Sequence, residues 1–439
     1  MTLYSLIYLF FFLPVFMGVY RLTPAKHRRW LIAAANLAVI ASQGIWGLAV
    51  YGADLAAVYV SGRVIADSRA RPDRIKLCRI LFASDMVLQA AMFVFFAKGR
   101  GADLAPLSGI AVAGGAVIAL HFVSYLADVW RGHEPADIGT LTAYSAFFPV
   151  TGVGPVLRYR RTVKIFAAPK VSFRKLGRGI WLYVFGLAEF LLISCRLSDV
   201  WQEYASLPVK SRGGAAAWLS LLIWYGAFMS GISGLLYMGQ GTAMMMGLRV
   251  RQPVRRRLFD SSLRSRLGGL CVHLTMWIRD YICSPIIRLT GRKLLASAAG
   301  TMFALLWFSF GWEGLAAGAA AAAVMVLQLK FTSGLKEPRP ITGAVFTKLA
   351  AASVGGVLAA LSLLPYGMPA FGLSLADIDN EVFNYLLEAS WLPLLTALFV
   401  TGSVLPTALR RMNTRWLIFI LPVLEVIALV LCSAYMLNR

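Results

Sequence analysis

Long apolar runs recur from one end of the chain to the other, with short polar connections between them. Each run is roughly 20 residues long, which is the length that a helix needs to cross about 30 Å of hydrocarbon. The runs lie at 3–20, 31–49, 51–67, 79–97, 107–128, 179–198, 215–246, 294–312, 313–331, 343–366, 391–409 and 416–436. This pattern predicts an all-α polytopic membrane protein with about 11–12 transmembrane helices.

The connections between the runs alternate in charge. Arginine and lysine cluster after the first, third, fifth and seventh runs and before the last, whereas the other connections are short or carry acids. Because basic residues accumulate on the cytoplasmic side of membrane helices, the alternation predicts an extracytoplasmic N-terminus and an extracytoplasmic loop at 367–390. The first run has no basic segment before it and no small-residue cleavage site, so we expect a retained helix there rather than a signal peptide.

Composition narrows the class of protein further. Hydrophobic residues make up 59% of the 439 positions and charged residues 14%, whereas an average soluble domain is about 25% charged. Soluble, disordered and fibrous classes are therefore excluded. The basic connections account for the net charge of +23, so we expect no nucleic-acid partner. The five cysteines and four histidines lack the spacing of metal ligands, and we expect no metal site.

Two segments break the pattern of spans. Residues 132–178 have an apolar centre marked by glycine and proline, and residues 259–293 are too charged to span simply. Polar or irregular backbone at membrane depth is tolerated only inside the protein or beside a water-filled cavity. We therefore predict a cytoplasmic or re-entrant segment at 132–178 and a re-entrant segment at 259–293, and we expect the chemistry to lie there.

Six stretches, taken in order, resemble the membrane-bound O-acyltransferase (MBOAT) family. They are FFFLPVFMGVYRLTPAKHRRW (10–30), FVSYLADVWRG (122–132), FFPVTGVGPVLRYRR (147–161), LLYMGQGTAMMMGLRV (235–250), LTMWIRDYICSPI (274–286) and ALLWFSFGWEGLAAG (304–318). The resemblance is greatest to the bacterial branch that includes the alginate O-acetylation membrane subunit and the teichoic acid D-alanylation membrane protein. Its order and spacing extend over nearly the whole chain.

This resemblance implies one membrane-embedded domain over 1–439, with a ring of helices around a central tunnel, in the bacterial inner membrane. It implies transfer of an acyl group to an exported or cell-surface glycan. The donor would be a thioester, either acyl-CoA or an acyl-carrier protein, with no bound cofactor. Expected partners are membrane lipid, an acyl carrier protein on the cytoplasmic side and an SGNH-hydrolase-like acyltransferase on the outer face.

The sequence departs from the family where the family keeps its catalytic histidine. Members use the histidine after the tryptophan of an LW-H-G motif as general base, since an imidazole with a pKa near 6.5 can take a hydroxyl proton. Here Trp307 matches that tryptophan and Phe308 the histidine. Phenylalanine cannot accept a proton. A second family histidine falls on Cys271.

Three other polar residues are candidates for the missing catalytic group. Cys271 is either a thioester-forming nucleophile or an inert buried thiol. His273 is either a relocated base or a hydrogen-bonded histidine inside a re-entrant helix; two helical positions place it about 200° from the Cys271 direction. Glu313 is either a carboxylate base with a raised pKa or a partner in interhelical hydrogen bonding.

Other matched positions predict a tunnel and a donor site. We expect the tunnel to be lined by Trp307, Trp277, Arg279, Asp280, Tyr281 and Asp128. We expect the donor to meet Arg158, Tyr159, Arg160 and Arg161, because guanidinium groups bind phosphate well. The same arginines also suit anionic lipid headgroups. Three alternatives remain open: a role in acyl transfer without the usual histidine, a catalytically silent conduit or scaffold for a partner acyltransferase, and an active enzyme with a non-standard base.

Overall fold

The computed structural model describes most of the first 308 residues and parts of the remainder. The described residues are 4–42, 44–68, 75–98, 114–150, 155–167, 171–208, 214–248, 254, 269, 271–308, 315–316, 318–323, 325–326, 380–401 and 414–437. Their regular secondary structure is helical, without a strand among them. The chain forms two compact units, one from Met1–Tyr183 and Met238–Arg251, the other from Val184–Tyr237 and Gln252–Arg439.

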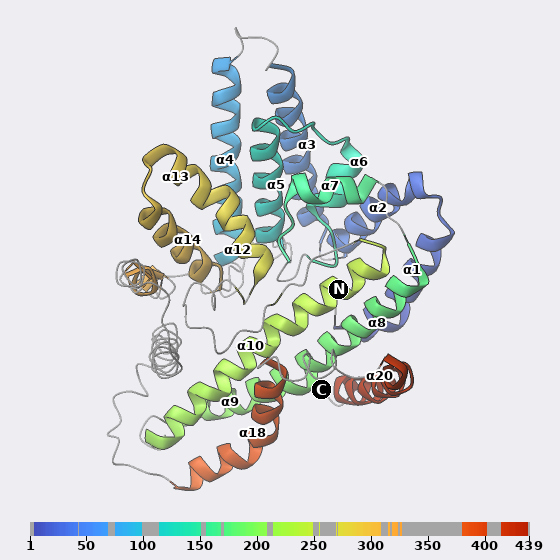
Figure 1. The fold of residues 1–439 in the computed structure, drawn as a ribbon, viewed down its shortest axis with the longest axis vertical. Coiled ribbons are helices and arrows are strands. Elements are labelled where there is room, and N and C mark those ends of the chain that lie inside the picture. Colours follow the sequence, from blue (N-terminus) through green and yellow to red (C-terminus); the bar gives the residue numbers. More distant parts are fainter. Residues whose placement is uncertain are drawn as a thin grey trace. The chain divides into compact units, whose positions relative to one another are not determined.

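The first unit is built from the N-terminal helices (Figure 1). These are the π-helix η1 (Ile7–Phe12), α1 (Leu13–Leu22), the 3₁₀ turn η2 (Ala25–His27), α2 (Arg28–Ala41), α3 (Ile45–Asp67), α4 (Ile75–Lys98), α5 (Gly115–Trp130), α6 (Ile138–Ser145) and α7 (Tyr159–Ala167). Helices α3, α4 and α5 pack against one another. Helices α8 (Phe173–Ala188) and α10 (Gly214–Met245) contribute residues to both units.

The second unit contains the remaining helices. These are η6 (Glu189–Cys195), a π-helical stretch, α9 (Arg196–Ser206), α12 (Val272–Ile278), the π-helical η8 (Arg279–Cys283), α13 (Ser284–Thr290), α14 (Lys293–Phe308), α18 (Asn380–Thr401) and α20 (Thr414–Leu437). A hydrophobic cluster joins α9, α10 and α18 around Leu197, Ile223 and Leu386, each of them fully buried.

The helices confirm the prediction of an all-α polytopic membrane protein. Four of the described helices are long and apolar enough to cross a membrane, namely Ile45–Asp67, Ile75–Phe96, Phe173–Ser206 and Ala215–Met245. Shorter apolar helices lie at Ile7–Leu22, Gly115–Trp130, Lys293–Trp307 and Val426–Met436. The predicted span at 343–366 lies outside the described residues, as do parts of the span at 313–331 and residues 367–379 of the predicted extracytoplasmic loop.

One boundary differs from the sequence prediction. The apolar runs predict a division at residue 50, but α3 continues through that position and begins at Ile45. The division lies instead at Gly44, whose φ of 145° is open to glycine and strained for other residues. Backbone geometry, rather than hydrophobicity, therefore sets this boundary.

Glycines allow α8 and α10 to approach closely. In the first unit, a Cβ added at Gly241 would lie 2.6 Å from the Gly179 carbonyl oxygen. In the second unit, a Cβ at Gly234 would lie 2.7 Å from the Gly186 carbonyl oxygen. Small residues of this kind let membrane helices pack backbone to backbone.

The π-helical turn η6 joins α8 to α9 without interrupting the helix. Its first residue, Glu189, is buried and accepts a hydrogen bond from the Ser233 hydroxyl of α10. Beyond it, two acids on α9 accept hydrogen bonds from tyrosines of the C-terminal helices. Tyr435 of α20 donates to Asp199 at 3.0 Å, and Tyr385 of α18 donates to Glu203.

Candidate functional site

A polar cluster lies in the apolar interior of the first unit, centred on His121 of α5. The His121 side chain is fully buried. Its Nδ1 atom lies 2.8 Å from the Ser145 carbonyl oxygen, and its Nε2 atom accepts the Leu157 backbone N–H at 2.9 Å. Since a carbonyl can only accept, Nδ1 carries the proton and Nε2 is the acceptor. Both imidazole nitrogens are therefore engaged by backbone, and His121 connects the end of α6 to the segment before α7.

Two more buried side chains hold the same backbone segment. The Asn36 amide of α2 donates to the Thr142 and Ala143 carbonyl oxygens at 3.0 and 3.2 Å. Its oxygen accepts the Phe148 N–H at 3.0 Å. The Tyr144 hydroxyl donates to the Leu157 carbonyl oxygen at 2.8 Å. Buried backbone groups outside regular structure need such partners, because an unpaired one costs about 1–3 kcal/mol.

The structure brings together three of the residues predicted from the sequence, namely Asp128, Tyr159 and Arg160. Asp128 is fully buried at the end of α5, and its Oδ2 atom accepts the Arg160 backbone N–H at 3.0 Å. Its Oδ1 atom pairs with the Arg131 guanidinium at 3.4 Å. The Tyr159 hydroxyl donates to the Glu134 carbonyl oxygen at 2.7 Å, and burial raises the pKa of this phenol, which therefore stays neutral. These contacts fix the start of α7.

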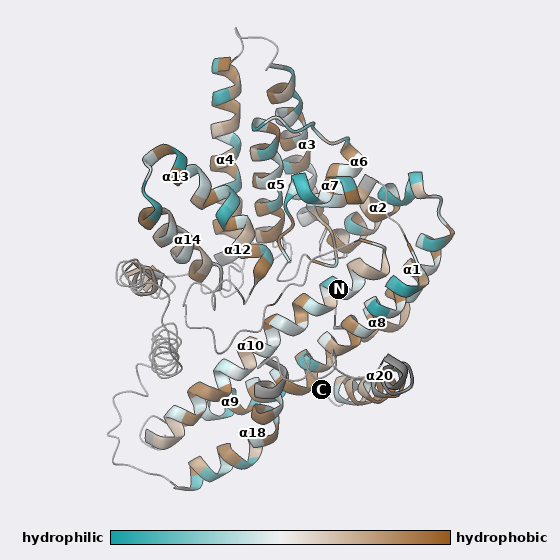
Figure 2. Ribbon diagram, in the orientation of Figure 1, coloured by the Kyte–Doolittle hydropathy of each residue, from teal (hydrophilic) through white to brown (hydrophobic). Residues whose placement is uncertain are grey.

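Helix α7 presents a polar face beyond this anchor. Tyr159 and Phe166 are buried, Arg158 and Arg160 are half-buried, and Arg161 is exposed. Figure 2 shows hydrophilic residues gathered on this short helix. The exposed Arg161 side chain is accessible to an anion, while the backbone of α7 is held by Asp128 and by Ser124, whose hydroxyl accepts the Tyr159 N–H at 2.9 Å.

The neighbouring helix α6 is capped by Asp137. Its carboxylate accepts the Thr140 N–H at 3.2 Å and the Thr140 hydroxyl at 2.7 Å, and it pairs with the Arg29 guanidinium at 3.1 Å. Partial burial acts to raise the pKa of Asp137, but the Thr140 hydrogen bonds and the Arg29 charge outweigh it and hold the pKa below its usual value. This carboxylate is therefore ionised at neutral pH.

The second group of predicted residues lies in the second unit, on α12, η8 and α14. The Trp277 side chain is buried, and its ring lies 5.2 Å from the Tyr281 ring and 5.7 Å from the Phe303 ring. Asp280 is buried and pairs with the neighbouring Arg279 at 3.1 Å, although the Arg279 side chain is 60% exposed. The aromatic cluster thus connects α12 with η8 and α14, and the ion pair lies within η8.

Cys271 and His273 lie at the start of α12. Cys271 is buried, and burial raises the pKa of its thiol to about 11. A thiol with that pKa carries very little thiolate at neutral pH. His273 is half-buried and lies two residues further along. Among the described residues, no group of three or more histidine, cysteine, aspartate or glutamate side chains is placed to hold a metal ion.

The remaining predicted site residues are described only in part. Trp307 is buried near the end of α14. Phe308 is the last residue of that helix, and its side chain lies outside the described residues. Glu313 also lies outside them.

The sequence interpretation did not single out His121 or Asn36. A signal for His121 is nevertheless present, because His121, Ser124 and Asp128 fall at positions i, i+3 and i+7 of an otherwise apolar helix. That spacing places them on one helix face. A polar stripe on one face of an apolar helix indicates a buried hydrogen-bonding role. Asn36 is the single polar residue of α2 beyond its first two arginines, and its spacing gives no comparable signal.

Comparisons with known proteins show similarity to probable alginate O-acetylases. No protein-family model matches it. The probable alginate O-acetylase AlgI of Azotobacter vinelandii is 26% identical over 299 residues, covering 64% of this chain and 59% of the relative. That of Pseudomonas fluorescens is 26% identical over 321 residues, covering 72% and 62%. That of Pseudomonas putida is 27% identical over 301 residues, covering 64% and 60%.

The chain thus spans about 60% of the length of the curated relatives that it matches. The similarity to probable alginate O-acetylases supports the resemblance of the six motifs to the membrane-bound O-acyltransferase family.

Proposed function

We propose that this protein takes part in acyl transfer, of an O-acetyl or similar group, to an exported or cell-surface glycan in the bacterial inner membrane. The observation that carries the proposal is the similarity to probable alginate O-acetylases over 64% to 72% of the chain. The donor would be an acyl-CoA or acyl-carrier-protein thioester on the cytoplasmic side. An SGNH-hydrolase-like acyltransferase would be the partner on the outer face, and the N-terminus would be extracytoplasmic.

The arrangement of α7 supports a donor site at this helix. A thioester donor of either kind carries phosphate, which guanidinium groups bind through paired N–H donors. Arg158, Arg160 and Arg161 lie half-buried or exposed at α7, and Asp128 and Ser124 hold its first turn through backbone contacts. The anchoring contacts engage backbone groups of α7, and the Arg161 side chain is exposed on this helix.

We further propose that the usual histidine-based catalysis is absent. The family histidine corresponds to Phe308, and phenylalanine cannot take a proton. His121 cannot replace it, because both of its nitrogens bind backbone. Cys271 is a poor nucleophile at neutral pH because its thiol pKa is raised to about 11. Removing a general base typically costs about 10²–10⁴-fold in rate.

An acyl-transfer assay on the purified protein tests this proposal. The donors are acetyl-CoA and an acetylated carrier protein, the acceptor probe is unacetylated alginate, and the readout is acetyl ester formed on the polymer. We expect no acetylation by the protein alone, and acetylation in membranes that contain the outer-face partner. Transfer by the protein alone at a normal rate, surviving His273→Ala, Cys271→Ala and Glu313→Gln, would contradict our assignment.

A gain-of-function variant tests whether the tunnel geometry is retained. We expect Phe308→His combined with Cys271→His to hydrolyse the thioester donor faster than the unaltered protein, since the double change restores both family histidines. The matched control is Phe308→Leu with Cys271→Ser, which alters the same positions without adding an imidazole. A double variant that folds but hydrolyses no faster than this control would count against the tunnel.

A catalytically silent scaffold is the second candidate function, and Phe308 is the observation that favours it. A scaffold would support acetylation in membranes equally well with Arg161→Gln, because it would not bind the donor. A conduit for the acyl group would lose acetylation in that variant. Lys164→Gln, a change of an exposed residue on the same helix, serves as the control.

A further inference from the structure

Two carboxyl groups lie within candidate membrane spans of the first unit. Asp54 is on α3 and Asp85 is on α4, and Gln89 follows Asp85 by one helical turn. The two carboxyls are near enough to repel each other when both are charged. Ionisable groups at this depth are costly, and they are paired or functional where they occur.

A hydrogen bond from Gln89 connects α4 to Asp54 of α3. The Gln89 Nε2 atom donates to Asp54 Oδ1 at 2.7 Å. This fixes the amide orientation, because the carboxylate oxygen can only accept. The other amide atom, Gln89 Oε1, is fully buried and has no hydrogen-bond partner.

Asp85 presents a second acceptor without a donor. The Asp85 side chain is only 6% exposed, and the Ser61 hydroxyl is hydrogen-bonded to its carboxyl. Its Oδ2 atom is buried and lacks a partner. Two buried acceptors, Asp85 Oδ2 and Gln89 Oε1, thus stand one turn apart on the same helix with no donor between them. Residues four apart on a helix are neighbours, about 5–6 Å between Cβ atoms.

We propose that Asp54, Asp85 and Gln89 form a proton-binding site that holds one proton on Asp85. A proton on Asp85 Oδ2 turns one acceptor into a donor that can meet Gln89 Oε1, so a single proton resolves both unpaired atoms. Gln89 then donates through Nε2 to Asp54, which stays ionised. The site carries one negative charge instead of two, which lowers the cost of burying it in the membrane.

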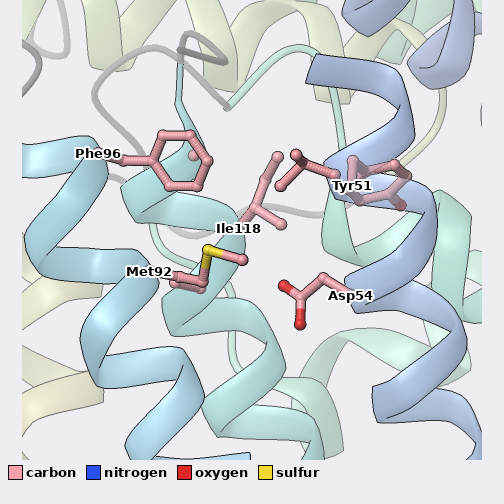
Figure 3. A pocket seen from close by; sticks show the side chains of 8 residues that line it. Tyr51, Asp54, Met92, Phe96 and Ile118 are labelled. Atoms are coloured by element: carbon pink, nitrogen blue, oxygen red, sulfur yellow. The ribbon is translucent and has the colours of Figure 1, made fainter. Parts of the chain in front are cut away.

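A small cavity borders one of the two carboxyls, and this is our reason for assigning the proton to the other. Asp54 lines a space of about 20 Å³ together with Tyr51, Met92 and Ile118 (Figure 3). That volume is enough for about one water molecule. Asp54 therefore has a route to hydration that supports its charge. Asp85 is not among the residues that line this cavity, so its neutral form is the favoured one.

The other titratable groups near these helices do not supply a counter-charge to Asp85. Arg63 of α3 lies over the Tyr59 ring at 5.4 Å and is exposed. Tyr51 donates or accepts at Ser145 rather than at a carboxyl. Tyr125 of α5 is fully buried, and the titratable groups that act on its hydroxyl are those of Arg63 and Tyr59. None of these described groups offers Asp85 a cation, so a proton is the remaining way to neutralise it.

Infrared spectroscopy of the protein in lipid vesicles tests the proposal. We expect a carbonyl band from a protonated carboxyl at neutral pH, lost in Asp85→Asn and retained in Asp54→Asn. Asp67→Asn is the matched control, because Asp67 is exposed on α3. The proposal is overturned if Asp85→Asn leaves the neutral-pH spectrum unchanged, or if the band is lost on adding Na⁺, since the site would then bind a metal cation.

Chemical labelling gives a second readout that needs no variant. Dicyclohexylcarbodiimide reacts with protonated carboxyls in apolar surroundings, and peptide mapping by mass spectrometry locates the adduct. We expect labelling of Asp85 that declines at alkaline pH. Labelling of Asp54 alone, or of neither carboxyl, overturns the proposal even if Asp85→Asn fails to fold. We expect that variant to fold, because its carboxamide N–H can replace the proton as donor to Gln89 Oε1.

Discussion

The two units hold their polar site residues in different ways. In the first unit, the polar atoms of His121, Asn36 and Asp128 accept hydrogen bonds from backbone N–H groups. These groups lie between the end of α6 and the first turn of α7. In the second unit, aromatic contacts around Trp277 and a half-exposed pair of Arg279 with Asp280 leave polar atoms at the surface of the cluster. The first arrangement holds backbone in place, whereas the second does not.

The difference shows that a buried histidine is not by itself a catalytic group. His121 is the most thoroughly buried of the described histidines, and both of its nitrogens are engaged. His273 lies in the segment that resembles the family active site, but it occupies a half-buried position off the expected register. Four substitutions test this contrast.

Replacing His121 should cost the most stability. We expect His121→Ala to lower the free energy of unfolding by about 3–5 kcal/mol, because it leaves the Leu157 N–H and the Ser145 carbonyl unpaired beside a new cavity. Thermal unfolding of the purified protein in detergent measures the effect. His273→Ala should cost much less, and His133→Ala, at an exposed position, close to nothing. Equal losses of stability in His121→Ala and His273→Ala would show that the two histidines do not differ in structural role.

Removing the charge of Asp128 should have an intermediate effect. An asparagine side chain keeps only one carbonyl oxygen, so Asp128→Asn loses one of the two contacts with the Arg160 N–H and the Arg131 guanidinium. We expect a loss of about 1–3 kcal/mol. Arg131→Gln, which removes only the ion pair, should cost less than Asp128→Asn. If both variants unfold at the same temperature, contrary to this expectation, the asparagine has kept the backbone contact to α7 and lost only the ion pair.

The helix cap at Asp137 should have a smaller, pH-dependent effect. We expect Asp137→Ala to cost about 1 kcal/mol, the usual value for a lost N-cap. Because the folded-state pKa is lowered, the contribution is complete above the unfolded-state pKa of about 3.9 and disappears as pH falls through the folded value. Unfolding of the two proteins compared at neutral and at acidic pH checks this. A difference that grows on acidification would have the wrong sign.

The ion pair of the second unit should matter least for stability. Arg279 is 60% exposed, and exposed pairs contribute about 0–1 kcal/mol. We expect Arg279→Gln to unfold at nearly the same temperature as the unaltered protein. Acetylation in membranes measures its functional role separately. A large loss of stability would mean that Arg279 has the structural role that we assign only to the first unit.

Much of the fold follows from hydrophobic patterning. Runs of apolar residues predict α4, the α8–η6–α9 helix and α10, because length and composition determine whether a helix can span the membrane. The break at Gly44 does not follow from hydrophobic runs, since it depends on a backbone angle and the two polar residues before it, Ser42 and Gln43, interrupt the apolar stretch only briefly. The apolar run at 31–49 also predicts a longer helix than α2, which covers only Arg28–Ala41.

The candidate site is less predictable than the spans. Motifs brought Asp128, Tyr159 and Arg160 to attention, and the structure places these three together. The Asn36 contacts join residues more than 100 positions apart, so no local spacing predicts them. Asp85 and Gln89 share a helix face, but their link to Asp54 depends on how α3 packs against α4. A sequence alone does not show which single polar residues pair with residues far away in the chain.

The wide turn η6 has a consequence for how related chains are compared. A π-helical turn holds one residue more than an α-helical turn would, so it offsets the helical phase of everything after it. Removing one residue there would rotate α9 by about 100° and swing Asp199 and Glu203 away from Tyr435 and Tyr385. A relative with an unbroken α-helix at this point would align correctly only with a one-residue gap in the middle of a membrane span.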